Sequence, residues 1–297
     1  MKKERQKILI RYNNYPDPVI GVHVIANTKG LYTIVAKTEQ KLEKFQVKEG
    51  LIVDNKVVAE KIIKELALGD KDTEDEIIVL YDTPDLLCFN TILPKAGRAR
   101  TKKLAKKELN EFFRTNSDTY KQINRIINRK DGGIIFYIDL IPGKLINSLE
   151  ELSNLMNKYI ESSVSFIQAV AGAFEERFKN PLDTFIVFRD GVSCHVLLLF
   201  ESKLIDSIAL YNSNPPESEI YSNLEILRSK HLFAYEKKET NHILFIVEEE
   251  DIRSRYESFF TNEKLFEIVQ ADITYDDIII TAAKYAGDYI DGFYIRI

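Results

Sequence analysis

A few groups of residues have the types and spacing that catalysis or ligand binding requires. Asp190-Gly191 could place a carboxylate beside a flexible backbone, as a site for Mg²⁺ and phosphate does. The same pair is typical of a hairpin turn, which is the reading we favour. The four carboxylates of residues 248–251 could bind a metal, although they suit a helix N-terminus better. Cys194 and His195 are adjacent on a predicted strand, so their side chains point to opposite faces and cannot act together.

Composition excludes several classes of function. The 297 residues include 41 lysines and arginines against 46 aspartates and glutamates, and the net charge of −5 excludes a globally basic nucleic-acid binder. Two cysteines cannot form a disulfide framework, which indicates a reducing compartment. The four histidines are scattered without zinc spacing, so we predict no metal site. We find no signal-peptide pattern and no apolar run long enough to cross a membrane, and we expect a cytoplasmic protein.

One basic cluster departs from the acidic average of the chain. The simplest interpretation is a solvated helix face. The functional interpretation is a docking surface for an acidic protein partner or for the anionic inner leaflet of a membrane. Nucleic acid is the third alternative, because no aromatic residue is interleaved with the first basic residues, and we predict no nucleic-acid partner. The candidate residues are Arg98, Arg100, Lys102, Lys103, Lys106 and Lys107.

Periodicity indicates a mixed α/β chain that repeats one order of elements. In the first half we predict strands over residues 19–26, 31–37 and 45–53, a helix to about residue 69, and a buried strand over 76–82. A block of a basic helix, two strands and a further helix follows. From residue 183 the early pattern returns, with strands over 184–188, 193–200 and 203–211. A long helix, a strand at 242–247, a helix over 251–260, a strand over 266–271 and a last helix over 275–285 complete the second half.

The repeated βββαβα order predicts two related α/β lobes that face each other across a cleft. We predict a first lobe over residues 1–180 that includes an inserted α/β subdomain at about 95–168. The second lobe then covers residues 181–297.

This plan resembles the actin-like ATPase superfamily, whose lobes are ribonuclease H-like. Within it, the chain resembles the bacterial PilM proteins of type IV pilus assembly and the cytoplasmic domain of type II secretion protein L. Val19-Ile20-Gly21-Val22 is similar to their opening strand, and residues 90–94 (NTILP) are similar to the segment that enters their extra subdomain. Residues 163–174 (SVSFIQAVAGAF) are similar to the strand and helix that return to the core.

The resemblance implies a nucleotide held between two hairpins, each with a pattern close to D-x-G-(S/T)-(S/T) and an aspartate that positions Mg²⁺. His23 stands at the aspartate position in the first lobe, and Phe188 stands there in the second. Glu249 and its acidic neighbours stand where the family has a glycine-rich adenosine loop. We therefore expect no catalytic residue, no bound cofactor and no ATPase activity.

We predict a non-catalytic adaptor in type IV pilus or type II secretion assembly, recruited to the inner membrane by a membrane-anchored protein. The resemblance implies a peptide-binding groove in the first lobe, lined by the hairpin of residues 19–37 and by the inserted subdomain. Two alternatives stay open. One is a divergent Mg-ATP-binding ATPase or kinase relative that uses Asp190 and Asp139. The other is a protein-binding module that uses the same fold for an unrelated purpose.

Overall fold

The first of two large sheets has five strands in the order β10-β6-β1-β2-β3. In the computed structural model, β1, β2 and β3 are antiparallel, whereas β6 runs parallel to β1 and β10 runs parallel to β6. The structure describes residues 6–15, 17–68, 76–94, 96–113, 120–128, 133–178, 183–231, 241–263 and 265–285. The strands of this sheet are β1 (Gln6–Asn13), β2 (Val19–Thr28), β3 (Leu31–Lys41), β6 (Glu76–Asp82) and β10 (Tyr159–Ser165).

The second large sheet repeats this plan. Its order is β13-β12-β11-β14-β15, with an antiparallel β11-β12-β13 unit and with β14 parallel to β11. Thus β11 corresponds to β1, and β14 corresponds to β6. The strands are β11 (Thr184–Arg189), β12 (Cys194–Phe200), β13 (Lys203–Leu210), β14 (Asn241–Val247) and β15 (Phe266–Ile268).

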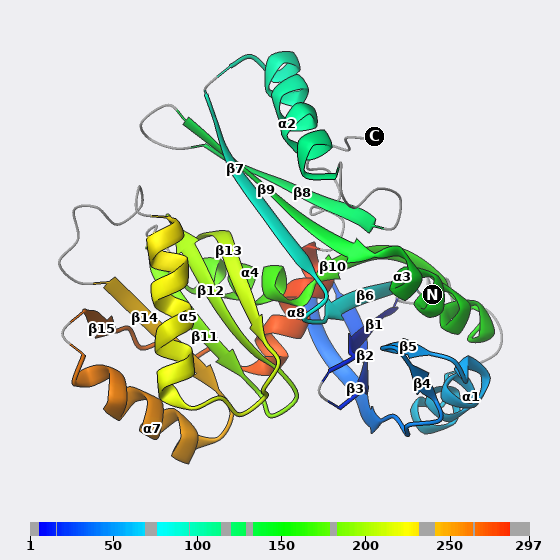
Figure 1. Ribbon diagram of the computed structural model, residues 1–297. Helices are drawn as coiled ribbons and strands as arrows, with labels where there is room; N and C mark the ends of the chain where they lie inside the picture. The colour runs from blue at the N-terminus through cyan, green and yellow to red at the C-terminus, as the bar shows by residue number, and fades with distance from the viewer. Residues whose placement is uncertain are drawn as a thin grey trace.

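Helices cover the outer face of each sheet and fill the space between the sheets (Figure 1). On the first sheet the outer helices are α1 (Asn55–Leu66) and α3 (Gly143–Leu155). On the second sheet they are α5 (Glu217–Lys230) and α7 (Glu250–Thr261). Between the sheets lie α4 (Phe166–Arg177) and α8 (Tyr275–Tyr285).

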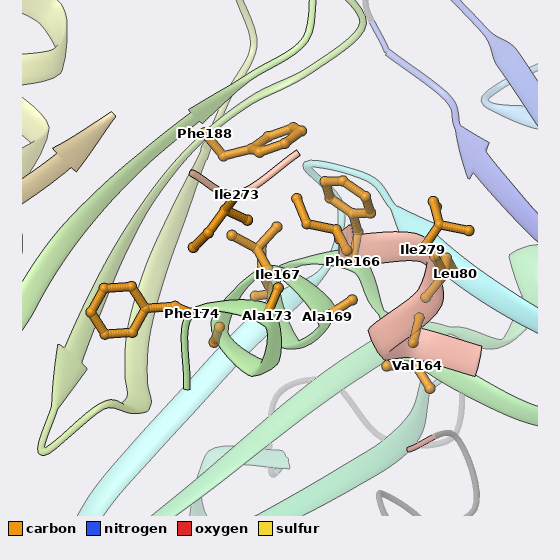
Figure 2. Packing of buried hydrophobic residues seen from close by; sticks show 14 of the residues in the cluster. Leu80, Val164, Phe166, Ile167, Ala169, Ala173, Phe174, Phe188, Ile273 and Ile279 are labelled. Carbon is orange, nitrogen blue, oxygen red and sulfur yellow. The ribbon is translucent and has the colours of Figure 1, made fainter. Parts of the chain in front are cut away.

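The core between the two lobes is continuous. Residues 166–174 of α4 are all buried, as expected of a helix that is apolar on every side. Figure 2 shows Leu80 of the first sheet and Phe188 of the second in one cluster with Phe166 of α4 and Ile279 of α8. The rings of Phe166 and Phe188 lie 5.0 Å apart between centroids. The lobes therefore share buried apolar surface instead of meeting across open solvent.

A third sheet is inserted between β6 and α3. It has three antiparallel strands in the order β7-β9-β8, and α2 packs against β7. None of the helices in the described part of the chain is long and apolar enough to cross a membrane. The inserted elements are β7 (Leu87–Pro94), α2 (Arg98–Phe113), β8 (Tyr120–Asn128) and β9 (Gly133–Pro142), and a separate small hairpin consists of β4 (Val47–Lys48) and β5 (Leu51–Ile52).

The duplicated α/β plan predicted from sequence is confirmed, with two corrections. The first lobe opens with β1, whereas we predicted its first strand at residue 19; residues 45–53 form only the short β4–β5 hairpin. We included residues 159–165 in the inserted subdomain, but β10 hydrogen-bonds to β6 and belongs to the first sheet. The lobe boundary near residue 180 stays a prediction, because residues 179–182 lie outside the described ranges.

Candidate functional site

A buried arginine lies at the centre of the interface between the lobes. Arg11 is on β1, which is paired on both sides, and the residue is only 3% exposed. On this strand Ile10 and Tyr12 pack toward α1 and α3, whereas Leu9 packs toward the second lobe. Side chains alternate along a strand, so Arg11 faces the second lobe with Leu9. A buried guanidinium is costly unless charged or polar groups surround it.

Arg11 has such partners on both lobes. Its Nε donates to Asp82 Oδ2 at 2.8 Å, and its Nη2 donates to the same oxygen and to Ser193 Oγ at 2.9 Å. Its Nη1 donates to Asp190 Oδ2. Asp82 ends β6 in the first lobe, whereas Ser193 and Asp190 belong to the turn between β11 and β12 in the second. The guanidinium therefore links three strand ends across the lobe interface.

His195 completes this group, which we call the Arg11 cluster: Arg11, Asp82, Asp190, Ser193 and His195. Its Nε2 lies 2.6 Å from Asp82 Oδ1, so both oxygens of that carboxylate have a partner. Burial alone would raise the pKa of Asp82, but Arg11 and His195 outweigh this effect and hold it well below its usual range. The cluster is thus a set of buried charges whose attraction depends on both lobes.

Aromatic rings enclose the guanidinium from the side of the helices. Arg11 Cζ lies 4.1 Å from the ring centroid of Phe166, at the start of α4, and 5.2 Å from that of Tyr275, at the start of α8. Both distances are in the range of cation–π attraction. Burial raises the pKa of Tyr275 to about 12, so its hydroxyl stays neutral beside these charges.

Asp190 has two roles in this arrangement. Its Oδ1 accepts hydrogen bonds from the backbone N–H groups of Val192 at 3.1 Å and Ser193 at 3.0 Å, and Gly191 has a φ of 81°. This geometry confirms the hairpin turn predicted for Asp190-Gly191. The other carboxylate oxygen, Oδ2, binds Arg11, a contact that the local sequence could not indicate.

A second arginine binds the strongly acidic segment. Arg189 ends β11 and is 4% exposed. Its Nη1 donates to Glu249 Oε2 at 2.5 Å, and its Nε donates to the carbonyl oxygen of Ser213 at 2.9 Å. Glu249 directly precedes α7, so residues 248–251 form a helix N-terminus as predicted. Burial, together with Asp190 and Glu249, raises the pKa of Glu248.

The duplicated plan identifies equivalent positions in the two lobes. Arg11 lies opposite Leu80 of β6, and Phe188 lies opposite Ile246 of β14, each on the first strand of its sheet and facing the other lobe. Phe188 therefore has Arg11 as its counterpart. His23, which we assigned to that position, lies on β2, where it is 4% exposed and its ring contacts Tyr275 with centroids 5.6 Å apart.

One end of the Arg11 cluster borders a small cavity. A cavity of about 20 Å³ adjoins His195, between the end of β6 and the second sheet. A cavity of this size can hold one water molecule. Its lining includes Tyr81, Thr83, Ile167 and Ser207.

Other candidate residues from the sequence lie elsewhere. Asp139 is on β9, and its Oδ2 accepts from Ser165 Oγ at 2.7 Å and from Gln168 Nε2, so it and Asp190 bind different partners. Cys194 packs in the outer core of the second lobe, on the face opposite His195, as predicted. In the described part of the chain, no three His, Cys, Asp or Glu side chains are grouped as metal ligands.

The six basic candidates all lie on α2. Arg100, Lys103, Lys106 and Lys107 are exposed to solvent, whereas the side chains of Arg98 and Lys102 lie outside what the structure describes. The groove that we expected between the 19–37 hairpin and the inserted subdomain stays a prediction. The β2–β3 hairpin lies at one edge of the first sheet, where β1 separates it from β6, the strand that precedes the insertion.

Known structures have the same arrangement of lobes, whereas no family model and no curated protein matches the sequence. A PilM–PilN type IV pilus biogenesis complex contains a chain that matches with a TM-score of 0.65 and 10% identity, over 98% of this chain and 100% of that one. A Bacteroides thetaiotaomicron protein with an actin-like ATPase fold and unknown function matches with a TM-score of 0.53 and 9% identity, over 94% and 97%. The chain has the actin-like ATPase fold.

A third structure extends this result. The cytoplasmic domain of EpsL, an inner-membrane component of the type II secretion system of Vibrio cholerae, matches with a TM-score of 0.53 and 8% identity, over 96% of this chain and 99% of that one. The resemblance to PilM and to type II secretion protein L predicted from sequence is therefore confirmed at the level of the fold. With this actin-like fold, the Arg11 cluster lies between the first hairpins of the two lobes, β1–β2 and β11–β12.

Proposed function

We propose that this protein is a non-catalytic actin-like scaffold. It binds the cytoplasmic segment of an inner-membrane protein in a type IV pilus or type II secretion assembly, and it does not use Mg-ATP. Fold alone does not determine activity, so the proposal depends on the residues that lie between the lobes.

The observation that carries the proposal is the position of Arg11. The fold resemblance implies an aspartate on the first strand of each lobe, where its carboxylate would position Mg²⁺. Here those equivalent places hold Arg11, whose charge repels a divalent cation, and Phe188, which offers no ligand atom. The carboxylates nearby, Asp82 and Asp190, already bind the guanidinium. The residues present do not fit a magnesium nucleotide.

The partner class comes from the similar structures. The PilM structure is a complex with PilN, and EpsL is an inner-membrane component of a secretion system. The first name describes a complex with a second protein, and the second describes an inner-membrane component of a secretion system. A protein partner of that kind therefore suits an actin-like fold in which a buried arginine and its carboxylate partners lie between the lobes.

A thermal-unfolding titration tests the nucleotide half of the proposal. We expect no Mg²⁺-dependent rise in Tm with ATP up to millimolar concentration, with ADP and Mg²⁺ alone as references. A ligand at 100 times its Kd would stabilise the protein by about 2.7 kcal/mol, which such a titration detects readily. A clear Mg²⁺-dependent rise would refute the proposal in favour of the divergent ATPase. Loss of that rise in Asp190→Ala would then locate the nucleotide beside Asp190.

A binding measurement tests the partner half. Fluorescently labelled peptides from the cytoplasmic segments of single-pass membrane proteins encoded beside this gene are titrated with the full chain, with scrambled peptides as matched controls. We expect saturable binding of one native peptide and none of its scrambled form. Absence of binding by every such peptide, together with no response to Mg-ATP, would favour a protein-binding module with an unrelated purpose.

A further inference from the structure

The exposed face of α2 carries a one-sided row of positive charge. Thr101 and Ala105 of this helix are buried, and the helix packs against β7. Exposed basic residues follow at spacings of three and four, which places them on one side of a helix. Figure 1 shows α2 on the side of the three-stranded sheet that faces away from the two large sheets. We call these residues the α2 basic row: Arg100, Lys103, Lys106 and Lys107.

Within the described part of the chain, most of this charge has no acidic partner. Lys107 Nζ lies 3.8 Å from Glu111 Oε1, whereas no carboxylate in the described ranges forms an ion pair with Arg100, Lys103 or Lys106. The net charge of the chain is −5, so the row is a local excess of positive charge on an acidic protein. Local concentration of one sign is the electrostatic signature of a surface that meets the opposite sign.

We propose that the α2 basic row docks the protein on an anionic lipid membrane. Three of its four members are lysines, compact point charges without the planar fork with which arginine binds a carboxylate in two places. Protein interfaces are depleted in lysine and depend on aromatic or arginine anchors in pockets. Among the described side chains of α2, no large apolar residue is exposed to act as such an anchor. A projecting lysine-rich helix face suits a broad layer of lipid headgroups better than a folded acidic protein.

The expected strength follows from the number of cations. Each lysine or arginine at an anionic surface contributes about 1 kcal/mol, which corresponds to about a fivefold change in the partition constant. The four residues together give binding that is reversible and sensitive to salt. The interaction does not require the peptide partner or the cleft between the lobes, so it extends the proposed function and can fail independently of it.

Vesicle flotation of the full chain tests the inference. One set of vesicles contains anionic phosphatidylglycerol mixed with phosphatidylcholine, and the other contains phosphatidylcholine alone. The salt concentration is raised from about 0.1 M to about 1 M, which shortens the screening length from ~10 to ~3 Å. We expect binding to anionic vesicles at the lower salt only. The triple variant Arg100→Glu/Lys103→Glu/Lys106→Glu should lose at least about 100-fold in partitioning.

A matched variant controls for the change in net charge. Lys44, Lys48 and Lys64 are exposed lysines near β4, β5 and α1, and Lys44→Glu/Lys48→Glu/Lys64→Glu changes the net charge by the same amount. It should bind anionic vesicles almost as the unaltered protein does, and circular dichroism checks that both variants are folded. Equal losses in the two triple variants, or equal binding to both vesicle types, would refute the inference. Binding to poly-glutamate but not to anionic vesicles would refute it in favour of an acidic protein partner.

Discussion

At the scale of single residues, the interface between the lobes is specified by charges. Arg11 contacts carboxylates from both lobes, and each partner is itself buried or part of a turn. Attraction between buried charges does not guarantee a net gain in stability, because each charge has lost its hydration. Removing one partner is different, since it leaves the others buried without compensation. The Arg11 cluster therefore favours one arrangement of the lobes over others.

This reasoning predicts a large loss of stability in Arg11→Ala. The variant leaves Asp82 and Asp190 buried without their cation, and breaking a buried ion pair in this way costs about 3–5 kcal/mol. Urea unfolding at pH 7 measures the effect. Lys41→Ala is the matched control, because it removes a cation whose pair with Asp17 is two-thirds exposed and contributes little. Similar losses in both variants would contradict the proposed role of burial. If Arg11→Ala does not fold, Asp190→Asn replaces it in the comparison, because the asparagine side-chain oxygen can still accept the hydrogen bonds from Val192 and Ser193.

A buried histidine predicts a pH dependence of stability. His23 is on β2, facing Arg11 of β1, Lys37 of β3, and Tyr275 and Asp276 of α8. Burial, together with the positive charges of Arg11 and Lys37, lowers its pKa from 6.5 to about 4, and Asp276 offsets this only in part. The unfolded chain therefore binds a proton at pH 5 that the folded protein does not bind.

The free energy of unfolding should consequently fall by about 2 kcal/mol between pH 7 and pH 5 on account of His23. This contribution is fully present above the unfolded pKa near 6.5 and is lost as the pH falls toward 4. Asp82 does not contribute to this change, because its pKa is lowered in the folded protein. Its stabilising effect is lost only when the pH falls below the ordinary pKa of aspartate, near 3.8. His23→Phe keeps a ring beside Tyr275 but cannot titrate. The free energy of urea unfolding should change less between pH 8 and pH 5 in this variant than in the unaltered protein. Parallel curves of this free energy against pH would contradict the assignment to His23.

The sequence could predict the placement of single residues in the site only where neighbouring residues along the chain determine it. The Asp190-Gly191 turn and the opposed faces of Cys194 and His195 follow from turn chemistry and strand alternation. The pairing of Arg11 with Asp82 and Asp190 spans 71 and 179 positions along the chain, and no local signal reports it. A charged residue within an apolar run was the available signal, because such a residue inside a strand needs a partner from elsewhere.

At the scale of elements, prediction succeeded where the pattern was continuous. Residues 76–82 and 275–285 form a strand and a helix with the predicted bounds. A short continuous apolar run is typical of a buried strand, and apolar residues at spacings of three and four are typical of a helix. β1 was missed because Arg11 and Asn13 interrupt its apolar pattern, although the strand is buried on both faces. Missing it shifted the assignment of the first lobe by one strand. The aspartate position was therefore sought at His23 on β2 instead of Arg11 on β1.

At the scale of the whole molecule, the lobes are joined by more than the Arg11 cluster. The apolar core between the sheets contains Leu80 from β6 and Phe188 from β11, together with α4 and with α8 from the C-terminal part of the chain. α8 follows the second sheet in sequence and yet packs against β1, β2 and β3 of the first. Two lobes that exchange an element and share a core are expected to lose their structure together.

This architecture predicts cooperative unfolding of the described lobes. Calorimetry should give one transition whose van't Hoff enthalpy approaches the calorimetric enthalpy. Native-state hydrogen exchange should assign similar opening free energies to β1 and β6 in the first sheet and to β11 and β14 in the second, because opening either lobe exposes the common core around α4. A lower opening free energy confined to one sheet, or two resolved calorimetric transitions, would mean that the lobes are independent folding units. In Arg11→Ala the opening free energies of the two sheets should fall together, because the Arg11 cluster joins strand ends of both. A lower opening free energy in the first sheet alone would show that the guanidinium stabilises only its own lobe.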